Sequence, residues 1–169
     1  MNHKVVVTGA TGDLGGKVMN RLKYQTDVEN LTVLVRDEKN DRVKQYKMDG
    51  IAVRIGDYAN PESLRSAFQG MDVLYFVSPE DDDQRAQLLK NVVNAAKQAG
   101  IQHIVYTSAV RKDERDSSPL ATLVDSHVRI EQRIQASGTV KGRYVCTGER
   151  LFPLISSKPA VDRRLVNEI

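Results

Sequence analysis

The chain of 169 residues is 40% hydrophobic, 28% charged and only 5% aromatic, a composition that is typical of a globular domain and excludes disordered, collagen-like and membrane-spanning classes. No apolar run approaches the roughly 20 residues that a spanning helix needs, and the first residues show no signal-peptide pattern, so we expect a cytoplasmic protein without membrane contact. The single cysteine, Cys146, cannot form an internal disulfide, and we expect no metal site.

The net charge of +3 is distributed unevenly along the chain. Residues 1–138 contain 19 basic and 19 acidic residues, whereas residues 139–169 carry the entire excess. No basic stripe with interleaved aromatic residues is present, so nucleic acid is not an expected partner. The sequence therefore predicts two parts: a charge-balanced domain over residues 1–138 and an atypical tail over residues 139–169, with poor order of that tail as one expectation.

Apolar β-rich segments alternate with helical patterns along the predicted domain. The expected strands cover residues 4–8, 31–35, 51–55, 73–77 and 103–107. The expected helices cover residues 14–24, 41–48, 61–68, 83–99 and 120–136. Continuous apolar runs such as Val73–Val77 indicate strands that are buried on both faces. We therefore predict an α/β fold, a Rossmann-like doubly wound parallel sheet with strand order 3-2-1-4-5.

The first strand runs into three glycines, Gly9, Gly12 and Gly15, which open the first helix. A turn of this kind brings free N–H groups at a helix start close to a pyrophosphate, because glycine lets the backbone approach it. The alternative is a structural glycine turn. The cofactor contacts predicted here are Gly9, Ala10, Thr11, Gly12, Asp13, Leu14 and Gly15.

Arg36 ends the second strand, where the adenosine ribose is contacted in such folds. An acidic residue there would repel a 2′-phosphate, whereas a guanidinium matches phosphate geometry. We therefore expect NADP(H) to be preferred over NAD(H). Two alternatives stay open: Asp37 could take the ribose role, and Arg36 could be a solvated charge.

Several short motifs occur together: GATGDLG at residues 9–15, VLVRD at 33–37, GDY at 56–58, LYFVSP at 74–79 and NVVNAAKQAGIQHIVYTS at 91–108. In this combination residues 3–138 resemble the NmrA-like branch of atypical short-chain dehydrogenases, and most closely its NAD(P)H-dependent quinone oxidoreductase type. The resemblance implies that Asp57 approaches the adenine and that Val77, Ser78 and Pro79 line the cofactor.

Thr107 and Ser108 end the fifth strand and are predicted to lie at the same edge of the sheet, because ligands bind beyond the carboxyl ends of parallel strands. Two structural alternatives remain: Asp57 could be a turn residue, and Ser78 could simply end its strand.

The tyrosine and lysine of typical short-chain dehydrogenases are missing, since no tyrosine in the chain is followed by a lysine four positions later. The resemblance places His127 at the catalytic position of the fifth helix, where an imidazole could donate a proton near neutral pH. The alternative is a buried, hydrogen-bonded histidine on the apolar helix face. Two charged segments, residues 80–83 and 111–116, are interpreted as an acidic helix start and a surface loop.

The resemblance stops after Gly138, and we expect a truncation or a shifted reading frame there. A residual strand around Tyr144 to Cys146 has poor periodicity. Loss of the sixth strand would leave an open sheet edge and favour a homo-oligomer.

Three functions follow as alternatives. The first is an NADPH-dependent oxidoreductase that transfers hydride to a quinone-like small molecule. The second is a non-catalytic NADP(H)-sensing regulator that acts through protein partners. The third is an inactive fragment that retains the nucleotide-binding half.

Overall fold

Short runs of valine and leucine form the centre of the fold, because these strands bury side chains on both faces. In the computed structural model, residues 3–79, 84–109, 121–136 and 141–147 are described. Every residue of β1 (Val5–Thr8) and β2 (Leu31–Val35) is buried. Burial on both faces is the property of a parallel sheet covered by helices on each side.

The sheet has the order β3-β2-β1-β4-β5-β6, and all of its neighbouring strands run parallel to each other. The remaining strands are β3 (Ala52–Ile55), β4 (Val73–Phe76), β5 (His103–Ala109) and β6 (Lys141–Thr147). The expected order of the first five strands is confirmed. The strands β2 and β3 are added on one side of β1, and β4 to β6 are added on its other side. The strand order therefore reverses beside β1, and open α/β sheets bind ligands at such a point.

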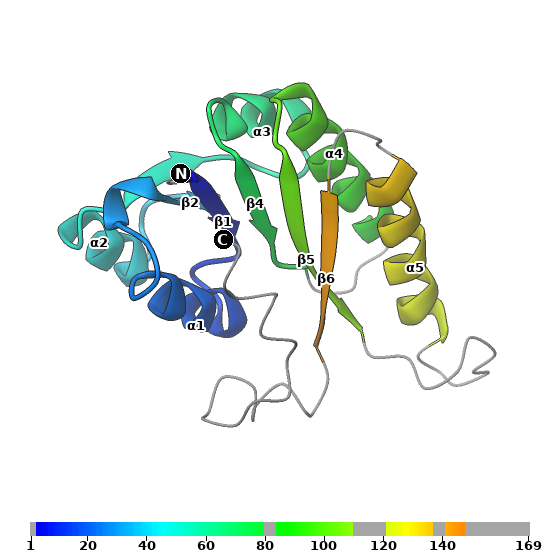
Figure 1. The fold of residues 1–169 in the computed structure, drawn as a ribbon, viewed down its shortest axis with the longest axis horizontal. Helices are drawn as coiled ribbons and strands as arrows, with labels where there is room; N and C mark the ends of the chain where they lie inside the picture. Colours follow the sequence, from blue (N-terminus) through cyan, green and yellow to red (C-terminus); the bar gives the residue numbers. More distant parts are fainter. Residues whose placement is uncertain (1–2, 80–83, 110–120, 137–140, 148–169) are drawn as a thin grey trace.

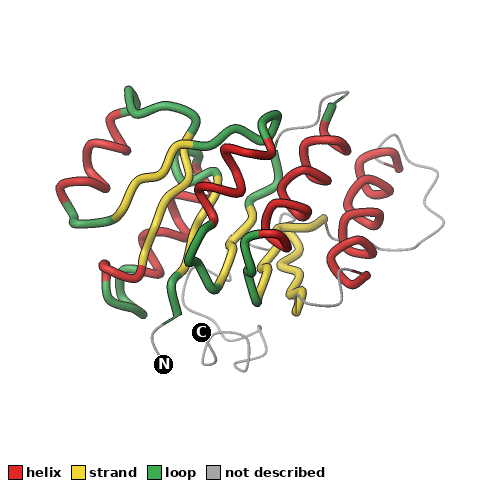
Figure 2. The backbone as a smooth tube through the Cα atoms, turned by 90° about the horizontal axis from the view of Figure 1, so that it is seen from above, coloured by secondary structure: helices red, strands yellow, loops and turns green. Residues whose placement is uncertain are grey.

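Helices alternate with the strands along the chain (Figure 2). They are α1 (Asp13–Leu22), the short 3₁₀ helix η1 (Val28–Asn30), α2 (Asp41–Met48), α3 (Pro61–Phe68), α4 (Arg85–Gln98) and α5 (Ala121–Ala136). Local capping fixes two of the starts. The side chain of Asn40 accepts the N–H of Arg42 before α2, and Asn60 accepts two N–H groups before α3.

Alternate strand residues divide into two hydrophobic cores, one on each face of the sheet. One core joins Val6, Leu74 and Ile104 to α3, α4 and α5. The other joins Val7 and Val33 to α1 and α2. Figure 1 shows α1 and α2 at one end of the sheet and α4 and α5 at the other.

The structure differs from the sequence-based expectation at the sheet edge. A sixth strand was expected to be lost, but β6 pairs in parallel with β5 over its whole length, from the pair His103 and Lys141 to the pair Ala109 and Thr147. Backbone hydrogen bonds form such a pair whatever the apolar periodicity of the strand. The edge of β5 that the sequence predicted to be open is therefore occupied by the chain itself. No helix within the described ranges is long and apolar enough to cross a membrane.

Candidate functional site

The turn between β1 and α1 has the backbone geometry of an anion cradle. Gly9 has a φ of 64°, a left-handed conformation that favours glycine, and its carbonyl accepts the N–H of Gly12 at 2.9 Å. Gly12 is the N-cap of α1, and no side chain in the described part of the protein caps this helix start. The first N–H groups of α1 are therefore available to an anion, which the positive end of the helix dipole also favours.

Gly15 cannot carry a side chain, because α1 passes directly over the turn. A Cβ at this position would lie 2.2 Å from the carbonyl oxygen of Gly9, a backbone atom that cannot move aside. A Cβ at neighbouring Gly16 would meet chiefly the end of the Arg42 side chain, at 2.7 Å. The glycine spacing in the sequence therefore reflects close packing of helix on strand at Gly15.

Two residues of α2 hold the turn in place, and neither could be recognised from the sequence pattern. Arg42 donates through Nη1 to the carbonyl oxygens of Gly12, at 2.6 Å, and Thr11, at 3.2 Å. The Tyr46 hydroxyl donates to the carbonyl oxygen of buried Ala10 at 2.8 Å. These bonds orient backbone carbonyls toward α2, so the opposite side of the turn presents N–H groups.

Asp13 and Lys17 form an ion pair one helical turn apart, with 2.8 Å between Oδ2 and Nζ. This hydrogen bond from Lys17 lowers the pKa of Asp13 below its ordinary value. The pair offsets the negative charge that Asp13 places at the helix start. Asp13 is exposed, and Leu14 and Thr11 are partly exposed, so these predicted contacts lie at the surface of the turn.

Thr8 ties the end of β1 to the end of β4. Its Oγ1 accepts the N–H of Val77 at 3.0 Å. Val77 also lies directly against the turn, since a Cβ on Gly9 would be 3.1 Å from the Val77 Cβ. The structure thus brings the predicted glycine turn and the predicted segment Val77 to Pro79 together at the point where the strand order of the sheet reverses.

Arg36 and Asp57 follow β2 and β3 at the same sheet edge, and both are exposed. Arg36 lies near enough to Tyr58 to lower its pKa, although burial dominates and raises the pKa of Tyr58 well above its ordinary value. Asp57 accepts the N–H of Ala59 at 2.9 Å through Oδ1, as in the turn alternative that the sequence left open. Contacts of Arg36 and Asp57 with a cofactor stay predictions.

Thr107 and Ser108 are placed below the surface of this edge. Both are buried, and each is engaged by a protein partner. Thr107 Oγ1 accepts the N–H of Ser78 at 2.8 Å, while the Ser108 hydroxyl donates to the Glu131 carboxylate. Thr107 thus supports the loop after β4, Ser108 is bonded to α5, and a direct contact of either residue with a ligand stays a prediction.

His127 lies in a buried polar cluster with residues from α4 and β5. Its Nε2 is 2.8 Å from Nη2 of Arg85, and its Nδ1 is 2.7 Å from the Tyr106 hydroxyl. Arg85 also donates to the Ser78 hydroxyl at 2.6 Å. His127 is only 5% exposed and Arg85 only 4%. These surroundings match the buried, hydrogen-bonded alternative that the sequence left open, and the role of proton donor stays a prediction.

Burial raises the pKa of three tyrosines around the sheet. The pKa of Tyr75 is raised to about 12, and the pKa of Tyr58 and Tyr106 is also raised by burial. For Tyr106 the effect of burial is opposed by hydrogen bonds with Ser78 and Arg85. All three are therefore neutral, hydrogen-bonding or packing residues at neutral pH.

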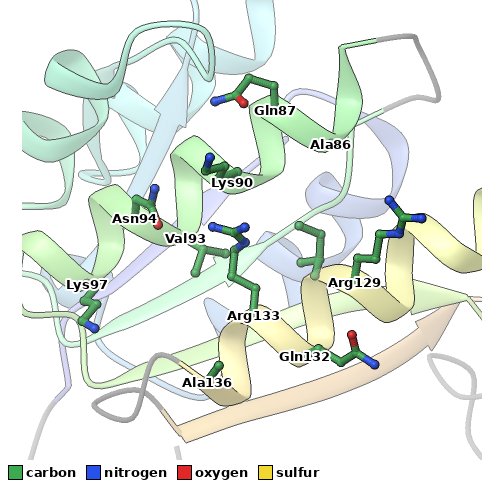
Figure 3. Close-up of a pocket in the computed structure, with 11 residues that line it drawn as sticks. Ala86, Gln87, Lys90, Val93, Asn94, Lys97, Arg129, Gln132, Arg133 and Ala136 are labelled. Atoms are coloured by element: carbon green, nitrogen blue, oxygen red, sulfur yellow. The ribbon is translucent and has the colours of Figure 1, made fainter.

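A groove of about 850 Å³ lies between α4 and α5, away from the turn. Four basic side chains line it: Lys90, Lys97, Arg129 and Arg133. Figure 3 shows Arg133 extending from α5 toward α4. Among its described lining residues none is acidic, and none belongs to the predicted site.

Two charged segments from the sequence analysis, residues 80–83 and 111–116, lie outside the described residues, as does most of the predicted tail. Within the residues that are described, no three or more histidine, cysteine, aspartate or glutamate side chains are arranged to hold a metal ion.

The sequence profile of the NmrA-like family matches residues 1–153 and so continues past Gly138. The chain belongs to the NmrA-like family. Among curated members related to it, quinone oxidoreductase 2 of Escherichia coli (strain K12) is 37% identical over 136 residues, which cover 80% of this chain and 46% of that protein.

Two solved structures of reductases are similar to this chain. The triphenylmethane reductase of Citrobacter sp., complexed with NADP(H), has a TM-score of 0.75 and 33% identity over 85% of this chain and 49% of its own. The NADPH-dependent quinone oxidoreductase of E. coli, complexed with NADPH, has a TM-score of 0.75 and 33% identity over 88% and 52%. The chain thus spans about half the length of the NmrA-like relatives that it matches.

Proposed function

We propose that this protein binds NADP(H) and passes hydride from it to a quinone-like small molecule. The observation that carries the proposal is the glycine turn, with a left-handed Gly9, a Gly15 that admits no Cβ and an uncapped start of α1. The turn suits the pyrophosphate of a dinucleotide, because N–H groups and a helix dipole face the same point.

Positive side chains beside this turn suit the additional phosphate of NADP(H). Arg36 ends β2, the position at which an acidic residue would select NAD(H), and its guanidinium is exposed. Arg42 is the second positive side chain, with one nitrogen already bonded to the turn. Two relatives with solved structures are complexes with NADP(H) or NADPH, in keeping with this choice.

When bound, NADPH supplies the hydride. The chain contributes the loop of Val77, Ser78 and Pro79, which we propose to line the nicotinamide end of the site. A quinone needs little further help from the protein, because the reduced oxygens can take protons from water. The names of the relatives support acceptors of this class, a quinone in one and a triphenylmethane dye in the other.

The experiment is a pair of measurements on the purified chain. NADPH is titrated while its own fluorescence is followed. NADPH absorbance is then followed with benzoquinone, a triphenylmethane dye or no acceptor. We expect saturable binding and acceptor-dependent oxidation. Failure of NADPH to bind or to raise the unfolding temperature would reject the proposal and favour the inactive-fragment alternative.

Cofactor choice is tested by replacing Arg36 with aspartate. We expect NADPH affinity to fall about tenfold or more, because a charge-assisted contact with phosphate is replaced by repulsion, while NADH affinity changes little. The matched control is Lys97→Asp, the same charge change in the groove of α4 and α5. Equal losses for NADPH and NADH in Arg36→Asp would contradict the assignment.

The regulator alternative is favoured by one observation, that both ring nitrogens of His127 are engaged by protein side chains. A chain that binds NADPH tightly but oxidises it at the same slow rate with and without every acceptor would support this second function. The same titration and absorbance measurements therefore separate the two.

A further inference from the structure

The starting point is the electrostatic position of Arg85. It is the first residue of α4 and is only 4% exposed, so a cation is buried at the positive end of a helix dipole. Both burial and the dipole oppose a charge there. An arginine at such a position needs partners that hold it, and its described partners include Ser78 after β4 and His127 on α5.

The chemistry of these partners fixes the protonation of His127. A guanidinium has only donors, so Nε2 of His127 must accept from Arg85 through its lone pair. The proton of the neutral ring is then on Nδ1, which donates to the Tyr106 hydroxyl. A doubly protonated ring would place N–H against N–H. The contacts thus select one of the three states that an imidazole can adopt.

The same guanidinium nitrogen fixes the Ser78 side chain. The Ser78 hydroxyl accepts from Arg85 at 2.6 Å and donates to the Pro79 carbonyl at 3.3 Å. The backbone N–H of Ser78 is held by Thr107. One buried arginine therefore connects α5 to the loop that we propose to line the cofactor.

We propose that Arg85 is a positioning residue, which locks His127 as the neutral Nδ1–H tautomer and sets the loop after β4 before any ligand arrives. Among the described residues, the charged or titratable groups facing the cluster are Arg85 on α4, Tyr106 on β5 and Glu131 on α5. The expected effect of Arg85 on NADPH binding rests on the proposed function. The expected tautomer of His127 does not depend on that function.

The tautomer is read from the ring nitrogens by long-range proton–nitrogen correlation NMR on the full chain. The chain contains three histidines, so a His127→Gln variant assigns the signal. We expect a protonated Nδ1 and an unprotonated Nε2 that stay unchanged between about pH 5 and 8, the range in which an ordinary histidine titrates. A wild-type His127 that titrates there, or that is protonated on Nε2, overturns the proposal.

Arg85→Met provides the second arm. We expect the single tautomer to be lost and NADPH to bind about tenfold more weakly, as for the loss of one buried hydrogen bond. Arg129→Met, an exposed arginine on α5, is the control and should change neither. If Arg85→Met does not fold, Arg85→Lys replaces it. Lysine keeps the charge, but its shorter side chain has no atom at the position of Arg85 Nη2, the single nitrogen that contacts both Ser78 and His127, so weaker NADPH binding is again expected.

An unchanged tautomer in a folded Arg85→Met overturns the proposal, as does unchanged NADPH affinity in Arg85→Lys where Arg85→Met does not fold. A wild-type protein that shows the locked tautomer but binds no NADPH leaves the lock intact and rejects only the proposed function. The pH profile of NADPH oxidation is a further readout: a positioning role predicts no step from His127 between pH 6 and 8, whereas a proton donor predicts one.

Discussion

At the scale of single residues, Gly15 has the least freedom in the described structure. Replacing it with alanine puts a Cβ 2.2 Å from the Gly9 carbonyl oxygen, so helix and turn must separate. We expect Gly15→Ala to lower the free energy of unfolding by about 3 kcal/mol, the upper part of the range for overpacking. Urea denaturation measures the loss.

Gly16→Ala is the matched control, because its Cβ would displace mainly the flexible end of Arg42. The gain in helix propensity, about 1 kcal/mol, should roughly offset that displacement. Equal urea midpoints for Gly15→Ala and the wild type would show that the turn is looser than described.

The glycine turn could be predicted from the sequence because its requirements are local, three glycines between a strand and a helix. Arg42 and Arg85 could not be predicted in the same way. Each contacts a residue that is far away in the sequence. Arg42 bonds to Gly12, 30 positions earlier, and Arg85 contacts His127, 42 positions later. No spacing within one element signals such a contact. The same limit applies to His127. Its position on a helix is compatible with a proton donor and with a buried structural residue, so the sequence could not decide between these two roles.

At the scale of elements, α3 depends on its N-cap. The Asn60 side chain accepts the N–H groups of Glu62 and Ser63, each at 3.1 Å, and Pro61 follows as the first helical residue. Asn60→Ala should cost about 1 kcal/mol of unfolding free energy, measured by thermal or urea denaturation.

Asn94→Ala on the exposed side of α4 is the comparison for Asn60→Ala, and it should be neutral or slightly stabilising because alanine favours helix. A comparable loss in both variants would mean that the cap contributes nothing specific.

Strands and helices of the first 109 residues were predictable because their apolar periods and caps are strong. β6 was not, because backbone pairing with β5 suffices to place a strand at an edge whose apolar pattern is weak. The groove between α4 and α5 was missed for a different reason. Charge balance over 138 residues says nothing about where lysines and arginines gather, and four of them line one groove.

At the scale of the whole molecule, tyrosines that are at least partly buried, such as Tyr75, set a limit to alkaline stability. Burial raises the pKa of Tyr75 to about 12, so the folded protein keeps a proton that the unfolded chain, with a pKa near 10, releases. Unfolding therefore becomes more favourable as the pH rises from 10 to about 12. The slope is at most about 1.4 kcal/mol per pH unit for each such tyrosine.

Tyr75→Phe keeps the ring but removes the ionisation, so its unfolding free energy should fall less steeply over that interval in urea titrations. Tyr24→Phe, at a residue that is 86% exposed, should follow the wild type. Identical slopes for Tyr75→Phe and wild type would show that this hydroxyl ionises as readily in the folded protein as in the unfolded chain.

The position of β1 between β2 and β4 has a consequence for how the chain is made. β1 can pair with β2 soon after synthesis, but its other edge waits for β4, and the contact between Lys4 and Asp72 joins residues 68 positions apart. At a synthesis rate of roughly 5–20 residues per second, that edge stays unpaired for several seconds. A run of three valines is then exposed on the ribosome, so a chaperone that binds extended apolar segments has its longest opportunity at β1.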